Sequence, residues 1–165
     1  MLTSAQKITL KAAIAAETDS TFAALRTAGN EQGMADWYNS LASPAFYCWR
    51  TNVSRVEIYN TTSGEGTTWS WTFYKNQAAV EQNAWVQMFM GDQADFSQAN
   101  LRAGIAVIFT SASAANATHA LAIGKRQAQR GEKVFASGTG TLATPATFGW
   151  QGTISAQDIS DALRS

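Results

Sequence analysis

The sequence predicts a mainly α protein: a bundle of five or six helices with a C-terminal extended arm made of a short strand and a short helix. Two observations support this fold class. Apolar residues recur at helical spacing, often behind a helix-capping residue, through residues 1–136. A stretch rich in Gly, Ser, Thr and Pro at 137–147 then separates these helices from a short alternating segment. We therefore divide the chain into a helical body, residues 1–136, and a linker with a C-terminal docking arm, residues 137–165.

The first part of the body contains three helices. Thr3 or Ser4 can cap the first, whose apolar side is formed by Leu2, Ile8, Leu10 and Ile14. A second helix over 20–27 is stopped by Gly29. A third runs over 30–42, and the apolar residues on one of its faces are Met34, Trp37, Tyr38 and Leu41.

The middle of the body is dominated by aromatic residues. Ser54 and Glu57 have the spacing of a capping box and open a short helix, which a polar loop at 60–66 follows. The next segment alternates like a strand but runs into a helix that ends near Gly91, so we expect an extended lead-in or an early helix start. So many large, rigid side chains are typical of a core or of a contact with another copy of the chain. We assign one of these two settings to Trp69, Trp71, Phe73 and Trp85.

The last helices and the arm follow. Asp95 or Ser97 opens a helix in which Gly104 indicates a close approach to a neighbouring helix. Another helix carries apolar residues from Leu121 to Phe135 and ends at Gly138. Residues 147–154 read as a strand, and 156–164 as a short helix behind a capping-box pattern.

The composition limits the kinds of function. Charged residues make up 15 % of the 165 residues, against about 25 % in average proteins. Twelve basic residues balance twelve acidic ones, so no net charge draws the chain to nucleic acid or to an anionic membrane. No apolar run approaches about 18 residues, so we expect no membrane contact. Cys48, the only cysteine, is expected to be a buried apolar residue, and no signal peptide precedes the first helix, which fits synthesis in a reducing cytoplasm.

No residue pattern indicates catalysis, a metal or a cofactor. His119 is the only histidine, without the partners of a catalytic triad or of a metal site. Asp92 and Asp95 have the spacing of helix-capping residues rather than of a carboxylate pair. The glycine pairs at 64–66 and 138–140 lack the strand and lysine of a phosphate loop. We therefore expect a protein that is not an enzyme and holds no cofactor.

Two segments are candidate contact surfaces. The one basic cluster consists of Lys125, Arg126, Arg130 and Lys133. On a helix, the last three share a face. This face is either solvated or paired with Glu132 and neighbouring subunits, or it contacts DNA phosphates or an acidic partner. The C-terminal strand either adds to a partner's sheet or pairs with another part of this chain, such as residues 69–73. Its candidate docking residues are Thr147, Phe148, Trp150 and Ile154.

Three stretches of the chain carry a resemblance to a known group of proteins. These are residues 49–55 (WRTNVSR), the run TTWSWTFYKNQAAVEQNAWVQMFMGDQADFSQANLRAGIAVIF at 67–109, and TPATFGWQGTISAQDISDAL at 144–163. They resemble small head and neck morphogenesis proteins of tailed bacteriophages and prophages, and the chain is similar to the helical head–tail connector, or adaptor, class.

The resemblance implies a structural protein of the virion neck that is made in the host cytoplasm. Such a protein forms an oligomeric ring of about twelve copies under the portal protein, with its C-terminal arm gripping the portal. A tail-side stopper or tail-completion protein would lie below, and DNA would pass through the ring without sequence-specific binding. The alternatives are another neck protein, a stopper or terminator, and a small soluble enzyme or nucleic-acid-binding accessory protein that uses His119 or the basic cluster at 125–133.

Overall fold

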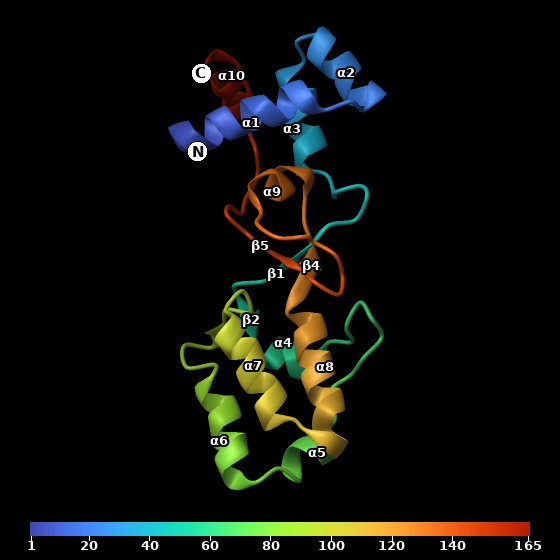
Figure 1. Ribbon diagram of the computed structural model, residues 1–165, viewed down its shortest axis with the longest axis vertical. Coiled ribbons are helices and arrows are strands. Elements are labelled where there is room, and N and C mark those ends of the chain that lie inside the picture. The colour runs from blue at the N-terminus through green and yellow to red at the C-terminus, as the bar shows by residue number, and fades with distance from the viewer. The chain divides into compact units, whose positions relative to one another are not determined.

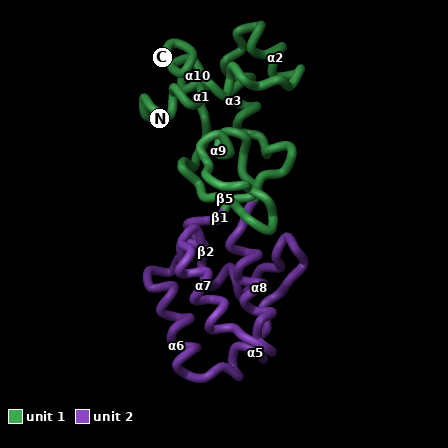
Figure 2. Tube along the Cα trace, in the orientation of Figure 1, with its two compact units in different colours: residues 1–48, 127–165 green, residues 49–126 purple.

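The structure, a computed structural model that describes residues 1–165, confirms the mainly α fold class (Figure 1). Ten α-helices, one 3-10 helix and five short strands make up the chain. The chain divides into two compact units (Figure 2). Unit 1 consists of residues 1–48 and 127–165, and unit 2 of residues 49–126. The second unit is therefore a continuous segment inserted between the two parts of the first.

Unit 1 is built from helices of both chain ends, and Figure 1 shows α10 beside α1. Its helices are α1 (Ser4–Ala16), α2 (Ser20–Thr27), α3 (Glu31–Asn39), α9 (Arg130–Phe135) and α10 (Ala156–Arg164). Thr3 caps α1, one of the two caps that the sequence predicts, and forms a capping box with Gln6. Ile8, expected on the apolar side, points to solvent. The buried side chains of this core are Leu2, Leu10, Ile14, Phe22, Met34, Ala35, Tyr38, Ile154, Ile159 and Ala162.

A capping box also starts α10, with Ser155 as the N-cap and Asp158 as its partner. The backbone N–H of Leu2 donates to Oδ1 of Asp158 over 3.1 Å, which ties the N-terminus to this helix. Three short strands form one sheet in the order β4-β1-β5. They are β4 (Lys125–Gln127), β1 (Tyr47–Trp49) and β5 (Ala146–Thr147). Cys48 is buried, as expected, in a small cluster with Ala128 and Ala146.

Unit 2 is a helical layer around buried aromatic rings. Its helices are α4 (Arg55–Asn60), α5 (Trp71–Lys75), α6 (Ala79–Gln87), α7 (Ala99–Ile108), the 3-10 helix η1 (Ser111–Ser113) and α8 (Ala114–Ile123). The strands β2 (Val53–Ser54) and β3 (Gln93–Ala94) pair antiparallel, with Val53 opposite Ala94. Ser54 caps α4 and Ser70 caps α5, so the aromatic segment begins its helix early. The methyl group of Met88 lies against Gly104, which fits the predicted close approach.

The prediction of a separate C-terminal arm at residues 137–165 is wrong, because the end of this segment belongs to the core of unit 1. Ile154, Ile159 and Ala162 are buried there, and α10 packs on both α1 and α3. Asn39 holds the chain before α10 in place, because its side-chain amide exchanges two 2.8 Å hydrogen bonds with the backbone of Ile154. The boundary at residue 136 therefore does not separate a body from an arm.

The expected flexible linker is an ordered loop. The backbones of Ser137 and Thr147 exchange two hydrogen bonds of 2.9 Å that close it. A left-handed backbone at Gly140, with φ of +68°, brings this glycine against the ring of Phe46. The extended part of 147–154 is limited to β5, which pairs within its own chain rather than with residues 69–73.

The long helix expected up to Gly138 is also two helices. The first ends at Ile123, just before the strand β4 that pairs with β1. Gly124 lies against the ring of Phe96, and its carbonyl accepts the Arg50 N–H over 2.8 Å. The chain then enters β4, and α9 starts only at Arg130.

Candidate functional site

The aromatic segment of unit 2 contributes both to the core and to the surface. Trp85 is fully buried and stacks on Trp69, with ring centroids 5.4 Å apart and an interplanar angle of 22°. Phe109 closes the cluster edge-on against both indoles. Phe73 is half-buried. Of the two settings that the sequence left open, the core therefore applies to Trp69 and Trp85.

Trp71 differs from the other tryptophans of this segment, because 54 % of it is exposed. Its ring lies 4.6 Å from that of Tyr59 and 5.9 Å from that of Tyr74. The Tyr59 hydroxyl accepts a 2.9 Å hydrogen bond from Nε1 of Trp85, which fixes the ring behind Trp71 to the core. Val56 precedes Tyr59 by three residues on α4, so it shares that helix face, and it is also exposed. We call Val56, Tyr59, Trp71 and Tyr74 the Trp71 patch.

A second exposed feature of unit 2 is the turn that ends α6. Met90 is 76 % exposed, whereas Phe89 before it is buried edge-on against Trp85. Backbone bonds from Met90 to Gln87 and from Asp92 to Phe89 close the turn. Asp92 has a left-handed backbone, with φ of +69°, and its side chain is exposed. It caps no helix, contrary to the sequence-based expectation, because Gln98 is the residue before α7.

His119 has a structural position. It is fully buried, and its Nε2 lies 2.7 Å from the Ile58 carbonyl oxygen. A carbonyl only accepts, so Nε2 carries the proton, and Nδ1 accepts from the Thr67 hydroxyl at 3.0 Å. The Thr67 hydroxyl also bonds Ser63, at 2.7 Å. The two ring nitrogens therefore hold α4, through Ile58, and the loop after it, through Thr67, on α8.

The structure separates the predicted basic cluster. Lys125 and Arg126 lie in β4, so they do not share a helical face with the other two residues. Lys125 also forms an ion pair with Glu65 at 2.6 Å. Arg130 and Lys133 stay together on α9. The break at Gly124 is the physical reason, because it ends the helix that the prediction extended through all four residues.

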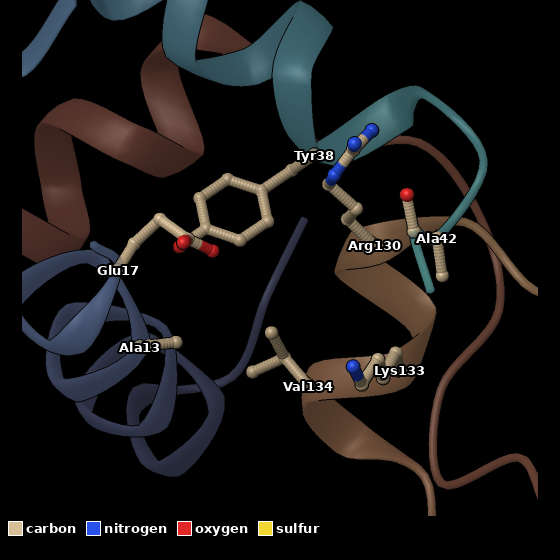
Figure 3. A pocket seen from close by; sticks show the side chains of 8 residues that line it. Ala13, Glu17, Tyr38, Ala42, Arg130, Lys133 and Val134 are labelled. Atoms are coloured by element: carbon tan, nitrogen blue, oxygen red, sulfur yellow. The ribbon is translucent and has the colours of Figure 1, made fainter. Parts of the chain in front are cut away.

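The two remaining cations line a pocket in unit 1 between α1, α3 and α9 (Figure 3). Its volume is about 190 Å³. Apolar, acidic and basic side chains meet in it, and the lining residues are Ala13, Glu17, Tyr38, Ala42, Ser43, Arg130, Lys133 and Val134.

The charged groups of this pocket are held in different ways. The Arg130 guanidinium lies 4.0 Å from the centre of the Trp37 ring and donates to the hydroxyl of Ser40 and the carbonyl of Leu41. The Lys133 ammonium lies over the Phe46 ring at 5.6 Å and forms no ion pair. A carboxylate oxygen of Glu17, the residue after α1, accepts the backbone N–H groups of the next two residues.

Tyr38 forms the buried wall of the pocket. Only 2 % of the residue is exposed, and its hydroxyl has no hydrogen-bond partner. Figure 3 shows its ring directed toward Glu17. Burial, reinforced by the negative charge of Glu17, raises the pKa of Tyr38 well above its ordinary value, so the hydroxyl is neutral and available as a donor.

The predicted docking residues of the C-terminus lie within unit 1. Ile154 is buried, and Phe148 packs beside Cys48 and Ala146. The half-buried ring of Trp150 meets Phe135 edge-on at 5.5 Å, and Thr147 pairs with Ser137. None of these four side chains forms the free, alternating row that strand addition to a partner would need.

Sequence reasoning missed the pocket and the exposed turn. Tyr38 falls on the apolar face of its helix and reads as a core residue, and nothing in the spacing links Glu17 to Arg130. Met90 likewise continues an apolar helical pattern. The helix nevertheless ends at Gln87, three residues before Met90, and the left-handed backbone at 91–92 follows.

Comparison of the chain with models of protein families, with curated proteins and with solved structures gives no match. No helix by itself has the length and apolar character to cross a membrane. Together, α7 and the helical segment 111–123 meet that test, as a pair bent by 120°.

Proposed function

We propose that the chain is a non-enzymatic structural protein of a tailed phage, a head–tail adaptor. In this role about twelve copies form a ring between the portal and the tail-side neck proteins. The single observation that carries the proposal is the Trp71 patch, a rigid aromatic surface that a folded unit leaves exposed. The resemblance of three stretches of the sequence to phage neck proteins supports the choice of assembly.

The Trp71 patch has the properties of an interface centre. Tryptophan and tyrosine are enriched among the residues that contribute most to protein–protein binding. The Trp71 ring needs little ordering on association, because Tyr59 and Tyr74 already support it and Trp85 fixes Tyr59. A lone exposed aromatic on a flexible loop would lack this advantage.

The rest of unit 2 has a surface that suits association. Several large apolar side chains besides Trp71 are exposed in this unit. They are Val56, Val80, Val86, Met90 and Val107. With charged residues making up only 15 % of the chain, few charges would need to be desolvated when copies pack together.

The test is the mass of the protein in solution, alone and with the portal protein of the same phage. We expect a ring-sized species in sedimentation velocity. Trp71→Ser should weaken its formation by at least about 30-fold, the effect of removing a central aromatic contact. The variant should fold normally because the ring is half exposed. Ile8→Ser, which removes a similarly exposed apolar side chain from α1, is the matched control and should assemble like the wild type.

Two results would count against the proposal. A chain that remains monomeric at tens of micromolar, both alone and with portal, is not an adaptor. Equal losses from Trp71→Ser and Ile8→Ser would show that association follows general apolar exposure rather than the Trp71 patch.

A further inference from the structure

Two exposed features of the chain have complementary charges that nothing in the single copy neutralises. The pocket of unit 1 contains Arg130 and Lys133, and neither forms an ion pair. The turn of unit 2 ends in Asp92, whose carboxylate forms no ion pair or hydrogen bond. Each feature therefore carries charge that forms no ion pair within one copy.

The pocket is preorganised to receive such a group. Stacking on Trp37 and two hydrogen bonds hold Arg130 in place, and Lys133 lies at the exposed edge of α9. The Tyr38 hydroxyl in the buried wall has no partner. Glu17, the one acidic group of the pocket, already accepts two backbone N–H groups. The cationic side of the pocket therefore remains available to an incoming carboxylate.

The turn of unit 2 has chemistry that complements the pocket. Met90 is 76 % exposed, an unusual position for a large apolar side chain, and Asp92 follows two residues later. Buried Phe89 and the backbone bonds from Met90 and Asp92 fix the turn on the core of unit 2. Arg55 lines the same small hollow as Asp92 without forming an ion pair with it. The turn therefore presents an apolar side chain and a carboxylate together.

We propose that the turn at 89–92 of one copy docks into the unit 1 pocket of a second copy. The Asp92 carboxylate pairs with the Lys133 ammonium beside Arg130, and the Met90 side chain packs against the apolar part of the pocket at Val134. The inference rests on the proposed function, since it names the contact that joins neighbouring subunits.

A second copy is the occupant that the structure favours. Both halves of the contact are on the same chain, and they are different surfaces, so the contact is heterologous. Contacts of that kind join copies head to tail and produce rings when the rotation closes. A methionine is suited to such a pocket because its flexible thioether adapts to irregular apolar walls.

Charge reversal tests the contact under the conditions in which the wild type assembles. Lys133→Glu and Asp92→Lys should each weaken assembly by at least about 30-fold, because each places like charges opposite one another. The combined variant should recover to within about fivefold of the wild type, because the pair is restored with its charges exchanged. Asp36→Lys reverses an exposed charge on α3, away from both surfaces, and serves as the control; it should not change assembly.

A second measurement, disulfide cross-linking, tests the same contact without charge reversal, in case the charge variants fail to fold. Lys133→Cys and Asp92→Cys are prepared as separate proteins, one carrying a size tag, then mixed and oxidised mildly. The cross-link between the two different variants should exceed either self-cross-link. Equal amounts of the three products overturn the proposal.

The outcomes also separate this inference from the proposed function. Rings that persist in both single charge variants overturn the docked turn and leave the adaptor role intact. If the charge variants lose portal binding but associate with themselves as before, the pocket binds another partner, and the docked turn is likewise overturned. If the wild type does not assemble, both the adaptor role and this contact are contradicted.

Discussion

At the scale of single residues, side chains of the same type have opposite roles in unit 2. Trp85 is completely enclosed, and Trp71, fourteen positions earlier, is half exposed on the same aromatic cluster. Sequence alone assigns both to a core or to an interface, because the spacing is the same in either case. The difference arises in the packing: Trp85 stacks beneath Trp69, whereas Trp71 lies outside Tyr59.

His119 is a stability residue, and its removal has a defined cost. His119→Ala should lower the free energy of unfolding by about 2–4 kcal/mol, because it leaves the Ile58 carbonyl without its partner, removes one hydrogen bond of the Thr67 hydroxyl and opens a cavity. Urea unfolding followed by tryptophan fluorescence measures this loss. Thr118→Ala is the control, since that exposed hydroxyl bonds only a carbonyl of its own helix. Normal stability combined with lost assembly would instead give His119 a direct part in function.

At the scale of elements, α10 depends on the charge of Asp158. Burial alone would raise the pKa of Asp158, but hydrogen bonds from Ser155 and from the Leu2 N–H outweigh it and lower the pKa. A carboxyl group with a lowered folded-state pKa stabilises the fold above its unfolded pKa of about 3.9. That contribution is lost as the pH falls through the lower folded-state value.

Asp158→Ala should therefore destabilise unit 1 by about 1–3 kcal/mol at pH 7, through the lost cap and the unpaired Leu2 N–H. The difference from the wild type should become smaller as the pH falls below about 4. Urea unfolding monitored by circular dichroism at pH 7, 5 and 3 measures it. Asp36→Asn, on an exposed position of α3, is the control. A difference independent of pH would show that the carboxylate charge does not contribute.

The sequence predicts most helices correctly, because their signals are local. The caps at Thr3, Ser54 and Ser155 lie directly before the helices that they start, and Gly91 lies in the turn that follows α6. The end of α8 at Ile123 was missed because the next residues form β4, which pairs with β1, a strand distant in sequence.

At the scale of the molecule, long-range packing decides the domain organisation. The glycine-rich stretch at 137–147 has the composition of a linker, yet it forms a closed loop between segments of one core. The bonds between Asn39 and Ile154 and between Leu2 and Asp158 join residues more than a hundred positions apart. The candidate pocket likewise combines α1, α3 and α9, so no local pattern could reveal it.

The central claim is that copies of this chain form a ring in the phage neck. A three-dimensional electron cryomicroscopy reconstruction of the virion neck tests it most directly. The account predicts a closed ring of about twelve copies adjoining the portal, into which units 1 and 2 fit as separate bodies. The Trp71 patch should lie at a contact between chains. Virions in which the neck shows no such ring, or from which the chain is absent by mass spectrometry, would contradict the claim.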